Sequence, residues 1–265
     1  RLRPRRRGGQ LHRHGAVAPL VDSARPGGGI DLFFFQRKAP DVRLRFGVDG
    51  VRASDVDRAA RALDDALGAV DGALDELRSV GAVDRWFAGP YEPEVRKFGG
   101  SGAADACHRH FDGETRLWLA AQRLGSDAGP IIDPSPLDLA VTSADDLFVR
   151  VLRDRDEVWD TWANLLDIAG DADPVAPRPV RLPVGDEASG PLANELAELA
   201  RGHESFATAI AAELEGGTLR VGPRAILPFV AQLDLQRWGF GGPLQAAVAT
   251  AMMSAWDPTQ DLRGR

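Results

Sequence analysis

The sequence contains a single cysteine, Cys107, among 265 residues. One cysteine cannot form an internal disulfide or a Cys-rich zinc site, so a disulfide scaffold and a zinc finger are both excluded. No apolar run reaches the roughly 18 residues that a membrane helix needs, and the arginine-rich start lacks the apolar segment of a secretory signal. We therefore expect a cytoplasmic protein that does not bind a membrane and whose stability comes from a packed core.

The signatures of common cofactor and nucleophile sites are also missing. There is no phosphate-binding loop, no paired-histidine metal helix and no glycine-framed serine, so we expect neither a metal nor a cofactor. Gly27–Gly29 precedes a predicted strand, whereas the glycines of a dinucleotide site follow one, and we interpret this run as a turn. His108 and His110 point to different faces of a predicted helix, and we expect both at the surface. His203 is predicted to be solvated rather than a catalytic base.

Charge is unevenly distributed along the sequence. Residues 1–45 carry 11 Lys/Arg and 3 Asp, a net charge of +8, whereas residues 46–265 carry 21 Lys/Arg and 36 Asp/Glu, a net charge of -15. The basic segment 1–45, and Arg1–Arg7 most of all, is therefore either a solvated tail or a surface that attracts nucleic acid or an acidic peptide. The negative charge of residues 46–265 and the lack of a known nucleic-acid-binding module argue against nucleic acid as the partner. An acidic peptide needs only a local basic groove.

The hydrophobic pattern predicts antiparallel strands near the front of the chain. Residues 30–36 are aromatic and apolar and are predicted to form a buried strand. In residues 42–46 apolar side chains alternate with Arg43 and Arg45, which predicts a strand with one apolar face and one face that presents two guanidinium groups. We expect these two strands to form a hairpin-like pair, and residues 84–88 are a third, short strand candidate.

Helical periodicity covers most of the remaining sequence. A long helix is predicted from an N-cap at Ser54 to Ser79. Further helices are predicted over residues 101–124, as two helices within 137–169 that are separated around 153–156, and over 192–214, 223–238 and 243–255. Residues 172–190 are rich in proline and acidic side chains and are predicted to be an exposed linker. Strands followed by helices indicate an α+β class, here as a single domain over residues 1–265.

Two groups of residues are candidates for chemistry. Arg43 and Arg45 project from one side of a strand, a pair suited to holding a carboxylate or a carbonyl that gains negative charge. Residues 91–100, Tyr-Glu-Pro-Glu-Val-Arg-Lys-Phe-Gly-Gly, place the only tyrosine, Tyr91, in one loop with two carboxylates and Arg96. Structural salt bridges would also explain either group.

The same two segments, residues 33–46 and 91–100, resemble the C-terminal domain of lantibiotic dehydratases, and the resemblance extends through most of the chain. It implies a fold of antiparallel strands packed with several helices. That domain has two forms: one eliminates glutamate from glutamylated Ser/Thr, and one forms the central pyridine ring of thiopeptides. Both act on ribosomally made precursor peptides, so the resemblance implies a leader-bearing peptide as partner, with an acidic leader bound by the basic N-terminal portion.

The resemblance also favours one of the two forms. The eliminating form has two strand arginines, a loop arginine and a histidine in the pattern His-Met-x-x-Asn-Arg, and the arginines correspond to Arg43, Arg45 and Arg96. Aligning Asn-Arg with residues 236–237 puts Gln232 at the histidine position, and glutamine has no titratable proton near pH 7. This departure favours the pyridine synthase, in which two dehydroalanines undergo a formal four-plus-two aza-cycloaddition with loss of water and of the leader.

Such a macrocyclisation depends on orientation and hydrogen bonding rather than on a cofactor. The resemblance implies that Gln232 hydrogen-bonds the reacting amide and that Tyr91 donates a proton or orients the peptide. Arg96 binds a carbonyl or shapes the site, and we count it with these two as catalytic. The expected substrate-binding residues are Arg43, Arg45, Phe35, Asp234 and Trp238.

Two other functions remain open. A stand-alone glutamate eliminase, working with a separate glutamylating partner, would use the retained arginines and would take His203 as its base. A non-catalytic leader-binding subunit would have kept the peptide groove and lost its chemistry together with the histidine. Turnover of a substrate would separate this last function from both enzymes.

Overall fold

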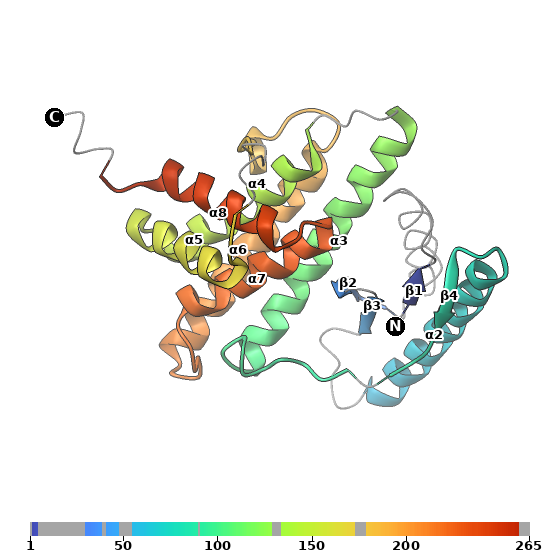
Figure 1. The fold of residues 1–265 in the computed structure, drawn as a ribbon. Helices are drawn as coiled ribbons and strands as arrows, with labels where there is room; N and C mark the ends of the chain where they lie inside the picture. The colour runs from blue at the N-terminus through green and yellow to red at the C-terminus, as the bar shows by residue number, and fades with distance from the viewer. Residues whose placement is uncertain are drawn as a thin grey trace. The chain divides into compact units, whose positions relative to one another are not determined.

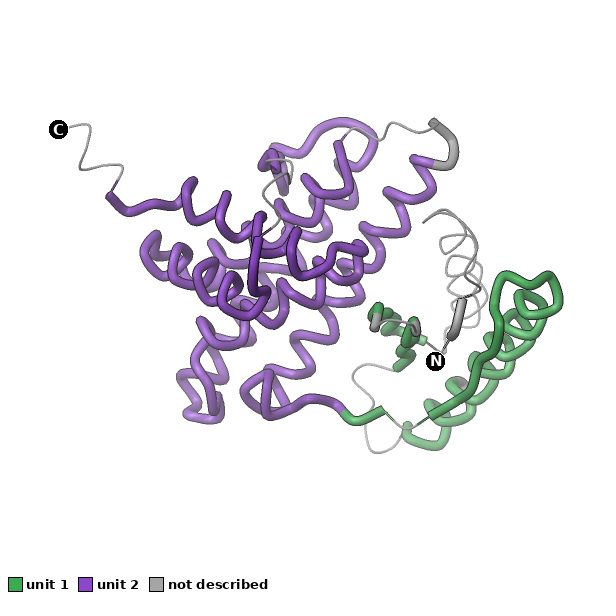
Figure 2. The backbone as a smooth tube through the Cα atoms, viewed as in Figure 1, with its two compact units in different colours: residues 1–92 green, residues 93–265 purple. Residues whose placement is uncertain are grey.

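The structure is a computed structural model, and it describes residues 2–4, 30–38, 41–47, 55–89, 91–128, 134–172 and 179–259. The chain runs through a small sheet and then through a series of helices (Figure 1). It separates into two compact units, residues 1–92 and residues 93–265 (Figure 2). That the two units form one domain stays a prediction. The predicted turn at residues 27–29 and the predicted N-cap Ser54 lie outside the described residues.

The first unit contains a four-stranded antiparallel sheet with the strand order β2-β3-β1-β4. Its strands are β1 (Leu2–Pro4), β2 (Leu32–Lys38), β3 (Asp41–Gly47) and β4 (Val83–Trp86). The expected pairing of the first two predicted strands is confirmed, because β2 and β3 align from Leu32 opposite Gly47 to Lys38 opposite Asp41. Helix α2 (Val56–Ser79) follows, with Asp55 at its N-cap position, and contacts β4.

The first strand is a correction to the sequence analysis. The basic N-terminal segment was expected to be a solvated tail or a peptide-binding surface, but Leu2–Pro4 forms β1 and pairs with both β3 and β4. The solvated-tail alternative is therefore wrong for these three residues. Strand pairing supplies backbone hydrogen-bond partners from distant parts of the chain, so a short polar segment can become a strand without a local hydrophobic pattern.

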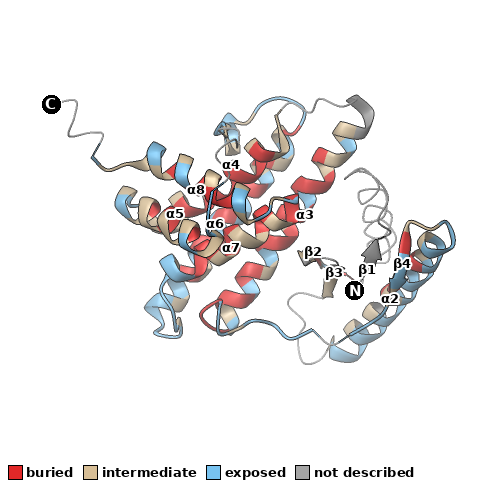
Figure 3. Ribbon diagram, viewed as in Figure 1, coloured by how far each residue is buried: buried red, intermediate tan, exposed pale blue. Residues whose placement is uncertain are grey.

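The second unit consists of helices whose apolar faces point inward (Figure 3). Its helices are α3 (Ser101–Ala128), α4 (Pro136–Leu152), α5 (Arg155–Ala169), the 3-10 helix η2 (Gly185–Glu187), α6 (Ala193–Glu215), α7 (Pro223–Trp238) and α8 (Gly242–Trp256). The α-helices confirm the predicted ones. Helix α3 packs against α6 and α7, α4 against the same two helices, and α5 against α7 and α8. Within the described part of the chain, no helix combines the length and the apolar character needed to cross a membrane.

The break between α4 and α5 falls where the sequence predicted it, and local chemistry explains it. Helix α4 ends at Arg153, which adopts a left-handed backbone conformation with φ 58°. Asp154 then caps α5, because its carboxylate accepts from the backbone N–H groups of Asp156 and Glu157 at 2.9 and 3.0 Å. A left-handed residue followed at once by an N-cap stops one helix and starts the next.

The proline-rich segment is exposed or partly exposed at every described position from 179 to 190, as predicted, but it is not a free linker. Its described part, residues 179–190, lies within the second unit and is fastened to α4. The backbone N–H of Val180 donates to Asp138 at 2.6 Å, that of Leu182 donates to Thr142 at 2.9 Å, and Arg181 pairs with Asp145 at 2.6 Å. These residues therefore form a strap along α4, because α4 supplies the hydrogen-bond partners that proline-rich backbone cannot find in itself.

Candidate functional site

The first unit brings the expected aromatic and basic residues together. Arg43 and Arg45 project from the same face of β3, where they lie opposite Gln36 and Phe34 of β2. The guanidinium of Arg45 lies over the ring of Tyr91, 4.6 Å from its centroid, and the Tyr91 ring meets Phe34 edge-on at 6.4 Å. Tyr91 is 41% exposed. A tyrosine hydroxyl and a guanidinium fork are thus held on one partly open face.

Phe35 occupies the other face of the same sheet. It pairs with Leu44 rather than with an arginine, and its side chain is 1% exposed. Successive side chains of a strand alternate between faces, so Phe35 cannot share a face with Arg45. We expected Phe35 to bind substrate, whereas the structure uses it as a core residue of the sheet.

In the second unit, the turn that carries Arg96 contacts α7. Arg96 is exposed in the turn that precedes α3, and the ammonium of the next residue, Lys97, lies 5.8 Å from the ring centroid of Phe229. Gln232 is three positions beyond Phe229 on α7, so the two lie on the same side of the helix, and both are partly exposed. Gln232 therefore lies one helical turn beyond the residue of α7 that Lys97 contacts.

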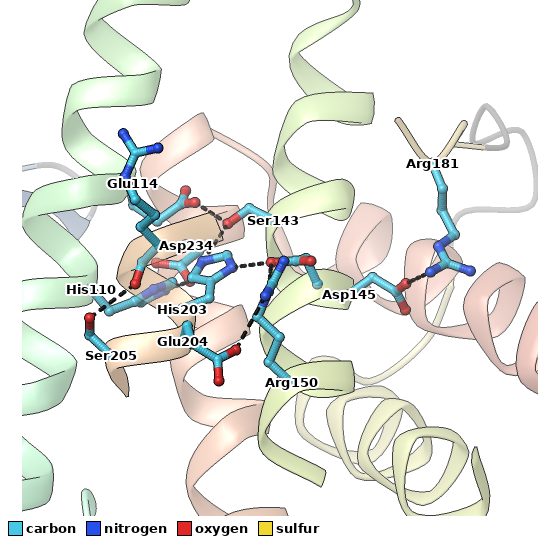
Figure 4. Close-up of polar contacts among 12 residues, drawn as sticks. His110, Glu114, Ser143, Asp145, Arg150, Arg181, His203, Glu204, Ser205 and Asp234 are labelled. Carbon is cyan, nitrogen blue, oxygen red and sulfur yellow. Dashed lines mark hydrogen bonds and ion pairs between the residues drawn. The ribbon is translucent and has the colours of Figure 1, made fainter. Parts of the chain in front are cut away.

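The interior of the second unit holds a buried polar cluster between α3, α4, α6 and α7 (Figure 4). At its centre, Nε2 of His110 lies 2.7 Å from one carboxylate oxygen of Asp234, and Nη1 of Arg237 donates to the other at 2.6 Å. All three side chains are 0% exposed. Burial acts to raise the pKa of Asp234, but the charges and hydrogen bonds of His110 and Arg237 outweigh it and lower this pKa. Asp234 is therefore ionised.

His203 forms the second part of the cluster. Its Nδ1 lies 2.7 Å from the carboxylate of Asp146, its Nε2 lies 3.5 Å from the hydroxyl of Ser143, and its ring lies 5.2 Å from that of His110. Burial first, and the charge of His110 in addition, lower the pKa of His203 to about 4 despite the hydrogen bond with Asp146. The imidazole is therefore neutral at pH 7.

Glu114 completes the cluster. Its carboxyl group is hydrogen-bonded to the hydroxyl of Ser143 and accepts from the indole N–H of Trp238 at 3.2 Å. Burial, together with the negative charge of Asp234, raises the pKa of Glu114. The protonated form is favoured, so a carboxyl group, a hydroxyl group and an imidazole follow one another from Glu114 through Ser143 to His203.

This arrangement can hold and share a proton, but it is closed to a peptide. Glu114, Ser143 and His203 are each at most 1% exposed. Groups that are buried and mutually hydrogen-bonded fix the relative positions of the helices that carry them. The cluster is therefore a structural network that links four helices, and within the described ranges no set of three His, Cys, Asp or Glu side chains is arranged to hold a metal.

The cluster overturns several expectations from the sequence. His110 and His203 were expected at the surface, and both are buried with carboxylate partners. Asp234 and Trp238 were expected to bind substrate, but their polar groups are engaged inside the helical unit. One feature of the sequence could have indicated the buried cluster. His110 and Glu114 are four residues apart on α3, a spacing that puts both side chains on one face of the helix.

Comparison with known proteins identifies the family. Residues 13–211 match the family model described as "Lantibiotic biosynthesis dehydratase C-term", which is more than half of the chain. The chain belongs to this family. The family fold is also seen in the crystal structure of the tRNA-dependent lantibiotic dehydratase MibB from Microbispora sp. 107891, with a TM-score of 0.64 and 17% sequence identity. The similarity covers 100% of this chain and 28% of MibB, so the chain spans little more than a quarter of that protein. None of the curated proteins compared with it matches.

The family match covers the candidate residues unequally. The strand arginines, Tyr91 and Arg96 lie inside the matched residues 13–211, and so do both buried histidines. Gln232 lies beyond the matched range. The match thus covers the arginine and tyrosine segments without testing the roles of these residues, and the correspondence of Gln232 with the family histidine likewise stays a prediction.

Proposed function

We propose that this dehydratase C-terminal domain forms a pyridine ring in a ribosomally made, leader-bearing peptide. One observation carries the proposal. Gln232, at the position that the resemblance gives to the histidine of the eliminating form, is partly exposed on α7, one helical turn beyond Phe229, which Lys97 contacts, whereas His110 and His203 are enclosed with carboxylates. Gln232 thus offers amide hydrogen bonds where the eliminating form has a histidine, although a partly exposed imidazole, that of His108, has its ring centroid 6.5 Å from that of Phe98 in the Arg96 turn.

The reaction joins two dehydroalanines of one peptide. The amide next to one alkene reacts as its iminol, the two alkenes combine in a formal four-plus-two cycloaddition, and the ring becomes aromatic by losing water and then the leader as an amide. Gln232 would hydrogen-bond the reacting amide, Arg43, Arg45 and Arg96 would hold carbonyl oxygens, and Tyr91 would donate a proton. Fixing two reacting groups in near-attack geometry lowers a barrier by roughly 7 to 11 kcal/mol, so orientation and amide donors supply the catalysis without a cofactor.

Mass spectrometry with two substrates tests this function. The protein is incubated with a leader-bearing, azole-containing peptide that already holds two dehydroalanines, and separately with a glutamylated peptide. We expect a pyridine-containing macrocycle from the first and no change in the second. Gln232→Ala should slow the first reaction, with Asn164→Ala as the control, because Asn164 is a half-buried amide on α5, away from α7. A full-rate Gln232→Ala enzyme would remove this residue from the mechanism.

The family assignment itself favours a second function, glutamate elimination. The matched family is that of a dehydratase domain, and the arginine-bearing segments lie within the match. The residue that we expected as the alternative base, His203, is enclosed between Asp146 and Ser143, so an eliminase would need another group to move the proton. Loss of glutamate from the glutamylated peptide, without reaction of the bis-dehydroalanine peptide, would establish this function instead.

A further inference from the structure

The position of Arg96 is set by its backbone alone. Its side chain is exposed and, among the described residues, makes no hydrogen bond or ion pair. The turn that carries it is closed by backbone hydrogen bonds from Lys97 to Glu94 at 2.9 Å and from Gly100 to Val95 at 2.9 Å. Whatever fixes this turn therefore fixes the backbone position from which the guanidinium group projects.

The end of the turn is fastened to the connection between α6 and α7. Arg220 donates its backbone N–H to the carbonyl of Gly99 at 2.7 Å. Gly99 has φ +85°, and a β-carbon there would lie 2.9 Å from both Ile226 and Leu219, so only glycine fits. Gly100 has φ +143°, and a β-carbon there would lie 3.3 Å from the carbonyl oxygen of Thr218.

Glu213, near the end of α6, lies at the same junction. Its carboxylate occupies the space in which a β-carbon of Gly102 would stand, in the first turn of α3. The hydroxyl of Thr218 donates to this carboxylate at 2.7 Å and sets its orientation. The first turn of α3 contains no acidic residue of its own, and the unpaired N–H groups at a helix start favour a negative charge. Glu213 supplies that charge from another helix.

We propose that Glu213 is a positioning residue for the Arg96 turn: its carboxylate, oriented by Thr218, anchors the start of α3 and the Gly99–Gly100 pair, and so fixes the backbone from which Arg96 projects. The consequence for turnover rests on the proposed function, in which Arg96 holds a carbonyl of the peptide. A side chain at position 102 would displace the Glu213 carboxylate from this place.

The test combines kinetics and hydrogen exchange on the full chain. Glu213→Ala should lower kcat for the bis-dehydroalanine peptide about ten- to a hundredfold, because small misplacements of a positioning group are amplified in rate. KM should change less, and Glu213→Gln, which keeps the shape and a hydrogen-bonding oxygen, should restore part of the rate. Glu215→Ala is the matched control, since Glu215 is exposed on the last turn of the same helix.

A double variant shows whether Glu213 acts through Arg96. If it does, Arg96→Ala combined with Glu213→Ala should be no slower than Arg96→Ala alone, because coupled residues are not additive. A double variant whose loss equals the product of the single losses would overturn the proposal, as would a full-rate Glu213→Ala enzyme.

Hydrogen exchange separates this inference from the proposed function. Backbone amides of residues 95–104 should exchange faster in Glu213→Ala than in Glu215→Ala, while those of α5 stay unchanged. Unchanged exchange at residues 95–104 would contradict the anchoring role, whether or not the enzyme is active. A wild-type protein that converts neither peptide would contradict the proposed function and leave the exchange result to decide on Glu213.

Discussion

Asp234 and His110 are 124 positions apart in the sequence, yet Nε2 of His110 lies 2.7 Å from the Asp234 carboxylate in the centre of the helical unit. Arg237 shares the same carboxylate at 2.6 Å. Two fully buried ionisable side chains from two helices, His110 and Arg237, therefore depend on one aspartate. The relationship joins α3 to α7 and makes the stability of the unit sensitive to a single charge.

Asp234→Asn should be strongly destabilising. Removing one partner of a buried ion pair leaves the other charges uncompensated and typically costs about 3 to 5 kcal/mol. The free energy of unfolding in urea measures the effect. Asp160→Asn is the control, because Asp160 pairs with Arg224 at 3.0 Å but is 45% exposed, and an exposed pair contributes about 1 kcal/mol or less. Equal losses in the two variants would contradict the buried pair.

His203 should make the protein less stable in mild acid. Its pKa is about 4 in the folded chain, against an ordinary value of 6.5 for a solvated histidine, so between these values the unfolded chain binds a proton that the folded chain does not. Stability should therefore fall as pH decreases from about 6.5 to 4, by on the order of 3 kcal/mol for a fully buried group. Urea unfolding at several pH values measures this. His203→Gln should flatten the curve, and an equally steep curve in that variant would assign the loss to other groups.

Glu114 should act in the opposite direction. Its pKa is raised by burial, so the folded chain retains a proton that the unfolded chain releases above about pH 4.5, and stability is lost as pH rises from there. Glu114→Gln mimics the protonated carboxyl group and does not titrate. The stability difference between the variant and the wild type should shift in favour of the variant from pH 5 to pH 9. A difference that is constant with pH would mean that Glu114 is ionised in the folded protein.

Tyr91 and Arg45 should contribute separately to turnover. Tyr91→Phe keeps the ring under the Arg45 guanidinium but removes the hydroxyl, and loss of a proton donor should lower kcat about a hundredfold without changing the melting temperature. Arg45→Lys keeps the charge but loses the planar fork, which should weaken the hold on a carbonyl. Kinetics with the bis-dehydroalanine peptide check both. A Tyr91→Phe enzyme at full rate would show that the ring, and not the hydroxyl, matters.

The sequence predicts most of the fold because the pattern that forms each element is local. Alternation around Arg43 and Arg45 predicted β3, and the spacing of apolar residues within 137–169 predicted two helices separated around 153–156. Strand β1 escaped prediction because its partners are strands far along the chain. Pairing at that distance leaves no trace in the three residues of β1 themselves.

The site was predictable only in part, for the same reason. The approach of Tyr91 to Arg45 agrees with the grouping that the two segments predicted. The buried cluster did not follow from the sequence, because the partners of His110 and His203 lie 124 and 57 positions away. A histidine in a polar stretch of sequence is expected to be solvated, because the sequence does not show that tertiary packing will bring a carboxylate to it. The same packing encloses Asp234 and Trp238, which we expected to contact the substrate.

The most direct test of the central claim is the mass balance of a single reaction. The protein is incubated with the leader-bearing bis-dehydroalanine peptide, and all products are measured by intact mass. The account predicts two products, a pyridine-containing macrocycle and the leader as an amide, whose masses add up to the substrate mass minus one water. Unchanged substrate, in a sample where the same protein releases glutamate from a glutamylated peptide, would contradict it.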